Sequence, residues 1–159
     1  MKGMTPLEHP LATALEREHR EIDSGIEQYA AADDGDTSPL LRSLAGLRRH
    51  IYLEEKFLFP PLREAGLMMP ILVMLREHGD LWRSMDALES LIADGAARDT
   101  VTEACRELLA KLDKHNLKEE PIIYPRADDG LTPEAAEELA AFIEAGRMPE
   151  GWVCEGAAA

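Results

Sequence analysis

Cysteine, aromatic residues and long apolar runs are all scarce in this chain of 159 residues. Its two cysteines, Cys105 and Cys154, are too few for a disulfide scaffold and lack the C-x-x-C spacing of a redox or zinc motif. Cys105 falls on an apolar helical stripe, so we expect it to be buried as a small core residue. Basic residues number 17 against 31 acidic ones, and the formal charge of −14 excludes nucleic-acid backbones and anionic membrane surfaces as partners.

No apolar run approaches the roughly 18 residues that a membrane span needs. The opening MKGMTPLEHPLATALEREH also lacks the apolar region of a signal peptide, so we expect a cytoplasmic protein with no membrane partner. Apolar residues make up 45% of the chain and charged residues 30%, which is typical of a globular domain. The length is enough for one domain, spanning residues 1–159, to bury a substantial core.

A repeated motif, L-x-x-H-x-x-x-E-E-x-x-x-[FY]-P, organises the chain. It occurs at residues 47–60 and again, 65 residues later, at 112–125. Residues four apart lie on the same face of an α-helix, so each copy pairs a histidine with a glutamate. These pairs are His50 with Glu54 and His115 with Glu119. One further histidine precedes each copy, His19 in EREHREID and His78 in LREHGDLW, which indicates a duplicated helical hairpin.

Apolar residues recur at three- and four-residue steps along four segments, which predicts an all-α, up-down-up-down four-helix bundle over residues 9–126. The first expected helix covers residues 9–32, and the second begins at a Ser38 N-cap followed by Pro39 and runs to about residue 63. The third covers about residues 70–93. The fourth begins at a capping box formed by Thr100 and Glu103 and is closed by Pro121 and Pro125. We expect Pro60 and Pro61 to bend or end the second helix. Gly79 indicates close approach of a neighbouring helix. A short fifth helix over 132–145 and a loose tail over 146–159 should follow, with Trp152 able to dock on the surface.

Six polar residues occupy the stripes that should face the core: His19, His50, Glu54, His78, His115 and Glu119. Buried carboxylates and imidazoles need compensation from hydrogen bonds, from a wet cavity or from cations. Their number and their repeated order favour a metal site. Four imidazoles and two carboxylates without a thiolate suit first-row metals, and they can hold two ions with both carboxylates bridging. A single structural zinc ion would leave two of the six unexplained.

Other residues near the motif carry weaker signals. Glu55 and Glu120 follow the two bridging carboxylates, and we expect them to face solvent or outer hydrogen-bond partners rather than to bind metal. His9 is expected at the surface. The three tyrosines can donate a hydrogen bond or an electron to a bound oxygen species, although half-buried packing is the favoured interpretation. They are Tyr29, Tyr52 and Tyr124.

The doubled H-x-x-x-E-E with a following aromatic-Pro resembles the hemerythrin-like proteins, also called HHE cation-binding domains, over about residues 9–126. The resemblance implies a four-helix bundle around two non-haem iron ions with an oxo or hydroxo bridge, zinc or manganese being substitutes, and the six residues named above carry over as ligands. Oxygen-carrying hemerythrins have a histidine where this chain has Trp82 and an aspartate where it has Glu119. The set of four histidines and two glutamates is therefore similar to the family's bacterial sensing, repair and peroxide-handling branches.

The resemblance implies a protein that binds or reacts with dioxygen, peroxide or nitric oxide, and it leaves peroxidase- or catalase-like turnover open. The alternative is a metal-dependent sensor, iron-handling or iron-sulfur-repair protein without peroxidase turnover. A third interpretation is a structural bundle whose core histidines and glutamates pair with one another. The expected partners are small oxygen or nitrogen ligands, together with an electron donor or other protein partner that the sequence does not identify.

Overall fold

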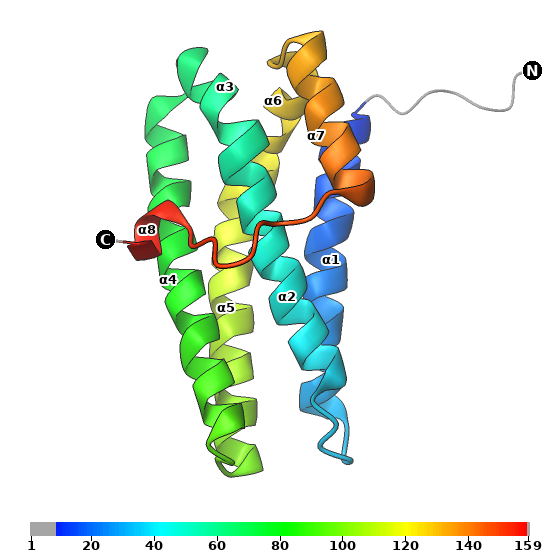
Figure 1. Cartoon of the computed structure of the whole chain (residues 1–159), viewed down its shortest axis with the longest axis vertical. Helices are drawn as coiled ribbons and strands as arrows, with labels where there is room; N and C mark the ends of the chain where they lie inside the picture. Colours follow the sequence, from blue (N-terminus) through cyan, green and yellow to red (C-terminus); the bar gives the residue numbers. More distant parts are fainter. Residues whose placement is uncertain (1–8, 159) are drawn as a thin grey trace, which may run out of the picture.

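Four long helices stand side by side and alternate in direction in the computed structural model, which describes residues 9–158 (Figure 1). They are α1 (Pro10–Ala31), α2 (Ser38–Leu53), α4 (Met68–Ala93) and α5 (Arg98–Ile122). Shorter elements are the π-helical turn η1 (Glu54–Leu58), α3 (Phe59–Glu64), α6 (Tyr124–Asp129), α7 (Pro133–Ala145) and α8 (Glu155–Ala158). The predicted all-α bundle is therefore confirmed, and none of the described helices is long and apolar enough to cross a membrane.

The second helix does not end at its prolines. Instead α2 passes into η1, where the Phe59 N–H donates to the Glu54 carbonyl five residues earlier, and then into α3. Pro60 and Pro61 lack an N–H and would crowd the carbonyls of an ordinary α-helical turn, so a wider turn lets the chain continue. The turn begins at Glu54, one of the six inward polar residues.

Several predicted helix ends differ from the observed ones. The prediction that a capping box at Thr100 starts the fourth helix was wrong, because α5 already starts at Arg98, after Ala97. Pro121 lies inside α5, where its ring is accommodated one residue before the helix ends. Pro125 does not close α5 but sits in the first turn of α6, where a missing N–H has no cost.

Two helix starts show how side chains satisfy free backbone N–H groups. Thr132 caps α7 as expected, since its hydroxyl accepts from the Ala135 N–H at 3.1 Å. At α1 the acceptor comes from far along the chain: the Asp128 carboxylate accepts from the N–H groups of Leu11 and Ala12 at 2.9 and 3.0 Å. The α6 segment is thereby tied to the start of the bundle.

The tail over residues 146–158 is not loose, contrary to expectation. It crosses α2 and reaches α4, where α8 packs (Figure 1). Cys154 is fully buried there, and the Trp152 ring lies 5.6 Å from that of Trp82. Gly79 explains the fit, because a Cβ at this position would lie 2.6 Å from the carbonyl carbon of Gly156. The close approach expected at Gly79 is thus an approach of the tail and not of a bundle helix. Residue 159, the last of the predicted tail, lies outside the described residues.

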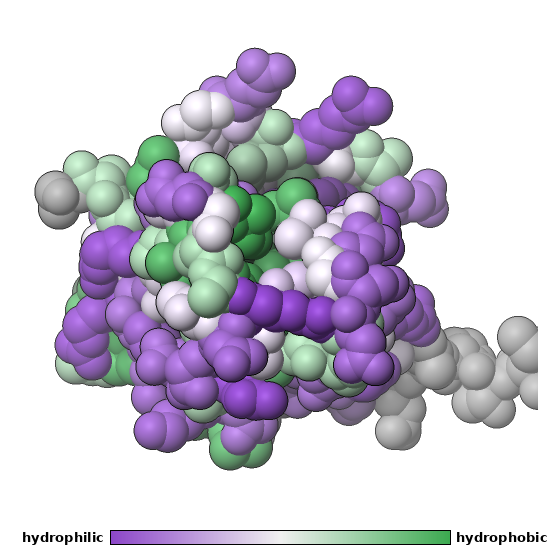
Figure 2. All heavy atoms as spheres, turned by 90° about the horizontal axis from the view of Figure 1, so that it is seen from below, coloured by the Kyte–Doolittle hydropathy of each residue, from purple (hydrophilic) through white to green (hydrophobic). Residues whose placement is uncertain are grey.

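The core consists of two apolar clusters with a polar layer between them. One cluster, toward the α1–α2 and α4–α5 loops, includes Leu44, Met85 and Cys105, which is buried as predicted. The other, toward α3, α6 and α7, includes Leu15 and Leu62. The surface at the end that carries the α1–α2 and α4–α5 loops is mostly hydrophilic around a central apolar patch (Figure 2). The apolar interior therefore isolates the polar layer from both ends of the bundle.

Candidate metal centre

The polar layer consists of the six inward residues expected from the sequence. Their possible ligand atoms fall into two groups, and within each group these atoms lie within 4.8 Å of one another. The first group is His19, His50, Glu54 and Glu119, and the second is Glu54, His78, His115 and Glu119. All six are buried, and both carboxylates, which belong to both groups, have no exposed surface. The structure thus brings the six side chains together into two adjoining groups, each of which could hold a metal ion.

Each carboxylate lies beside one histidine four residues earlier in the chain and one histidine of the other hairpin. Glu54, the first residue of η1, lies 3.1 Å from Nε2 of His50 at the end of α2 and 3.0 Å from Nε2 of His78 on α4. Glu119 on α5 lies 3.4 Å from His115 Nε2 and 3.1 Å from His19 Nε2 on α1. The four-residue spacing supplies the local pairs, and the antiparallel bundle supplies the others.

A second ring of carboxylates surrounds the histidines. Each imidazole Nδ1–H donates to one glutamate, at 2.7 or 2.8 Å, in the pairs His19–Glu120, His50–Glu18, His78–Glu55 and His115–Glu77. This hydrogen bond fixes the tautomer and turns Nε2, the atom that can bind a metal, toward the centre.

Two of these outer carboxylates, Glu55 and Glu120, are outer hydrogen-bond partners as expected. The other two, Glu18 and Glu77, were not predicted. Their signal in the sequence was the triplet Arg-Glu-His, which occurs at residues 17–19 and again at 76–78.

Tyr124 lies inside the centre, which corrects the expectation of half-buried packing. It has no exposed surface, and its hydroxyl donates to Glu54 Oε2 at 2.5 Å. The hydroxyl oxygen of Tyr124 also lies 3.0 Å from Glu119 Oε1, 2.7 Å from His19 Nε2 and 2.8 Å from His50 Nε2. Tyr29 and Tyr52 stay outside the centre, the former buried in the core and the latter packed against Phe57.

The repeat explains where this phenol lies. Tyr124 and Phe59 occupy the same position of the motif, the aromatic residue before proline. The Tyr124 ring lies 5.2 Å from that of His19, and the Phe59 ring stacks 5.4 Å from that of His78. The two halves therefore place matching rings beside matching histidines, but only one ring carries a hydroxyl.

The electrostatics of the layer reflect close pairing of opposite charges. Burial lowers the pKa of His50, but Glu54 and Glu18 outweigh it and raise this pKa to about 10. Burial acts on His115 in the same way and is outweighed by Glu119 and Glu77, so its pKa also rises to about 10. Burial raises the pKa of Glu119, yet the neighbouring histidines hold the net value well below the ordinary range. Both shared carboxylates therefore remain anionic.

The donor set fits a cation. Glu54 Oε1 and Glu119 Oε2 are buried and accept no hydrogen bond of acceptable geometry, although His78 Nε2 lies 3.0 Å from the former. Buried anionic oxygens with unused lone pairs require a compensating partner. A divalent ion in each group would supply one, and imidazole with carboxylate is the ligand set that borderline first-row metals prefer.

A small cavity adjoins the centre on the side of the α1–α2 loop. It is lined by the four histidines and Glu54, by apolar residues including Leu47 and Leu81, and by Asp23 and Asn116. Its volume of about 10 Å³ is close to that needed by one water. The buried Asp23 Oδ1 and Asn116 Oδ1 have no hydrogen-bond partner among the described residues. The centre can thus admit only a very small ligand without rearrangement.

These features define a helical bundle that encloses histidine and carboxylate side chains able to bind a metal cation. The chain matches the model of the hemerythrin HHE cation-binding domain over residues 11–127, and it belongs to that family. It is also 26% identical over 131 residues to uncharacterized proteins of Mycobacterium bovis and of two strains of Mycobacterium tuberculosis. The match covers 76% of this chain and 51% of each relative, so the chain spans about half the length of these curated relatives. No solved structure matches.

Proposed function

We propose that the protein binds two iron ions and that their centre binds or reacts with dioxygen, peroxide or nitric oxide. The proposed ligands are His19, His50, Glu54, His78, His115 and Glu119. The observation that carries this proposal is the sharing of both buried carboxylates by two histidine pairs, since one ion would use only one of the two groups. Zinc and manganese accept the same ligand types and are the expected substitutes.

Bound iron would supply one-electron redox chemistry and coordination positions for a small exogenous ligand. The chain's own residues would orient and enclose that ligand. The adjoining cavity is the proposed place for it, since this space borders the four histidines and has room for about one small molecule. The two apolar clusters on either side exclude bulk water and larger substrates.

Tyr124 is the proposed hydrogen-bond donor within the centre. Burial and the negative charges of Glu119 and Glu54 raise the pKa of its phenol well above the ordinary value, so the hydroxyl keeps its proton. By donating this proton to Glu54 Oε2, it can hold the carboxylate in place when a small ligand binds at the centre or leaves it. The matching Phe59 cannot do this on the other side.

Electrons for a reductive reaction should come from a separate donor. Burial raises the pKa of both Cys105 and Cys154 to about 11, so neither is a thiolate at neutral pH. The thiols are therefore poorly suited to act as internal reductants, and we propose an external electron donor.

Elemental analysis of the purified protein tests the metal proposal first. We expect two iron ions per chain and near-ultraviolet absorption bands from a coupled diferric centre. Glu119→Gln should lose both ions, because Glu119 belongs to both groups, whereas Glu120→Gln should keep measurable iron. Protein purified without iron, zinc or manganese, and unable to take up any of them, would refute the proposal.

Peroxide consumption by the iron-loaded protein separates the enzymatic form from the binding form. Turnover above that of an equal concentration of free iron supports a peroxidase- or catalase-like activity. If iron binds stoichiometrically but peroxide decays no faster than with free iron, the enzymatic form fails and a sensing or iron-handling role is the better account.

A further inference from the structure

The C-terminal segment, residues 133–158, lies beyond the part of the chain that matches the family model, yet hydrogen bonds connect it to the second ring of carboxylates, directly at Glu55 and through Arg49 at Glu18. These connections leave the segment at two places, the end of α7 and the start of α8. Both contacts lead by hydrogen bonds to the Nδ1 atom of a histidine in the centre.

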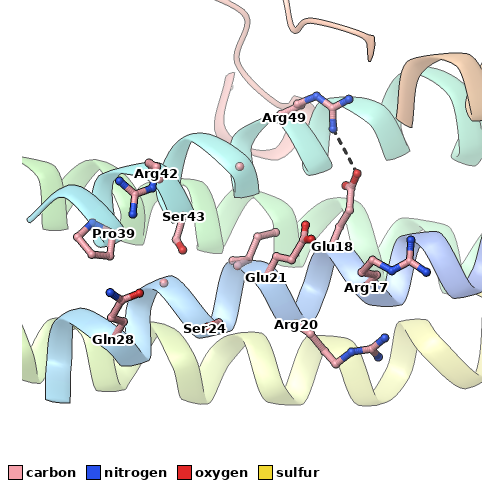
Figure 3. Close-up of a pocket in the computed structure, with 13 residues that line it drawn as sticks. Arg17, Glu18, Arg20, Glu21, Ser24, Gln28, Pro39, Arg42, Ser43 and Arg49 are labelled. Atoms are coloured by element: carbon pink, nitrogen blue, oxygen red, sulfur yellow. Dashed lines mark hydrogen bonds and ion pairs between the residues drawn. The ribbon is translucent and has the colours of Figure 1, made fainter. Parts of the chain in front are cut away.

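The first connection runs through Arg49 on α2. Its guanidinium donates to the carbonyls of Ile143 and Gly146 at 3.0 Å and to that of Phe142, which lie in the last turn of α7 and just beyond it. The same guanidinium donates from Nη1 to Glu18 Oε2 at 3.2 Å (Figure 3). Glu18 Oε1 in turn accepts the Nδ1–H of His50 at 2.7 Å. The end of α7 therefore holds Arg49 in place, and Arg49 holds Glu18, the hydrogen-bond partner of His50.

The second connection runs through Glu55 on η1. Its Oε1 accepts the backbone N–H of Glu155 at 3.1 Å, and its Oε2 accepts the Nδ1–H of His78 at 2.8 Å. The position of the tail is set by glycine contacts, since a Cβ at Gly156 would lie 2.6 Å from the carbonyl oxygen of Leu75. The peptide N–H thus reaches Glu55 only because the backbone of the tail packs directly on α4.

The other two histidines do not depend on this segment. The carboxylate that holds His115, Glu77, is bound on its second oxygen by Lys118 of α5. The carboxylate that holds His19, Glu120, belongs to α5 and is partly exposed. Two of the four histidines are therefore supported within the bundle, and two by the C-terminal segment.

We propose that the C-terminal segment positions His50 and His78 for metal binding, with Arg49 and Glu55 as the positioning residues. This inference rests on the proposed function, since it assumes that the two histidines bind ions. Outer hydrogen bonds of this kind orient a ligand ring and increase its basicity, and their loss typically weakens metal binding about 10- to 100-fold. The segment would thus set how tightly one histidine of each group holds its ion.

Two pairs of variants of the full chain test the inference. Arg49→Met removes the first connection, and Arg48→Met is its control, because Arg48 is also on α2 but binds Asp86 and Glu89 instead. Glu155→Pro removes only the backbone N–H of the second connection, and proline is accepted at the first position of a helix. Its control is Glu155→Ala, which keeps that N–H.

Each protein is loaded with zinc, which is diamagnetic, and is examined by zinc stoichiometry, by the rate of zinc release to excess chelator and by imidazole N–H signals in NMR. We expect wild type and controls to bind two zinc ions. Arg49→Met and Glu155→Pro should release zinc faster, with about 100-fold as the upper bound, since that is the effect of losing the histidine's own partner. The Nδ1–H of His50 should exchange faster with solvent in Arg49→Met and that of His78 in Glu155→Pro, while that of His115 is unchanged in both.

The outcomes separate this inference from the proposed function. Normal zinc content with release rates and Nδ1–H exchange equal to those of the controls would overturn the positioning role and leave the metal centre intact. Absence of zinc uptake in wild type and controls alike would refute the metal centre and this inference with it. Faster release with all four Nδ1–H signals equally affected would indicate general loosening of the bundle and would also overturn the inference.

Discussion

Replacing Tyr124 by phenylalanine should destabilise the metal-free protein far more than the loss of one hydroxyl at an ordinary core position. This hydroxyl lies 2.5–3.0 Å from four polar atoms of the centre, two of them carboxylate oxygens. A hydrogen bond to a charged group contributes about 1.5–3 kcal/mol, and its loss leaves Glu54 Oε2 buried with one fewer partner. In a protein of this size, each kcal/mol shifts the melting temperature by about 2–4 °C, so we expect a decrease of about 3–12 °C.

Thermal unfolding of the chelator-treated protein, followed by calorimetry or circular dichroism at neutral pH, measures this decrease. Tyr29→Phe is the matched control, because Tyr29 is also nearly fully buried but lies in the apolar cluster toward the loops, with its ring facing Arg98. The control should change the melting temperature only slightly. Equal melting temperatures for the two variants would show that the contacts of the Tyr124 hydroxyl contribute no net stability, against the reasoning above.

Three further predictions concern the whole domain. Removing bound metal with a chelator should lower the melting temperature, since each ion present at about 100 times its Kd contributes about 2.7 kcal/mol; an unchanged melting temperature would contradict metal binding. In the metal-free protein the raised pKa values of His50 and His115, about 10 against an ordinary 6.5, contribute stability that is complete below pH 6.5 and is lost as the pH rises through 10. Urea unfolding across this range should show the loss, and a flat profile would contradict it. Asp128→Ala should cost about 1–2 kcal/mol in urea unfolding by freeing the first N–H groups of α1, whereas Asp129→Ala, at an exposed position, should not.

The fold and the six central residues were predictable because both depend on one periodicity. A helix repeats every 3.6 residues, so a polar residue at an apolar position of the stripe must face the core wherever the helix packs. His50 and Glu54 satisfy this at a spacing of four, and the same pattern 65 residues later supplies the facing pair. The antiparallel pairing of two hairpins then brings the pairs to one level.

The missed features depend on departures from that periodicity. The π-helical turn at Glu54–Leu58 shifts the register of everything after it, so the direction of an aromatic residue five positions beyond the ligand could not be read from a regular helix. Tyr124 likewise follows the break after Ile122, where α5 ends. The tail carries no amphipathic pattern because it is held by glycine contacts, backbone hydrogen bonds and a few rings such as Trp152.

The duplicated sequence would make the two proposed ion sites equivalent, and the structure departs from that symmetry in two ways with different consequences. The C-terminal segment supports one histidine in each group, His50 in the first and His78 in the second. Its loss should therefore weaken the binding of an ion by both groups. The hydroxyl of Tyr124 contacts the histidines of the first group alone, whereas Phe59 faces the second. A difference in affinity between the two ions should therefore trace to position 124, and restoring the symmetry with Tyr124→Phe should reduce it even when the C-terminal connections are intact.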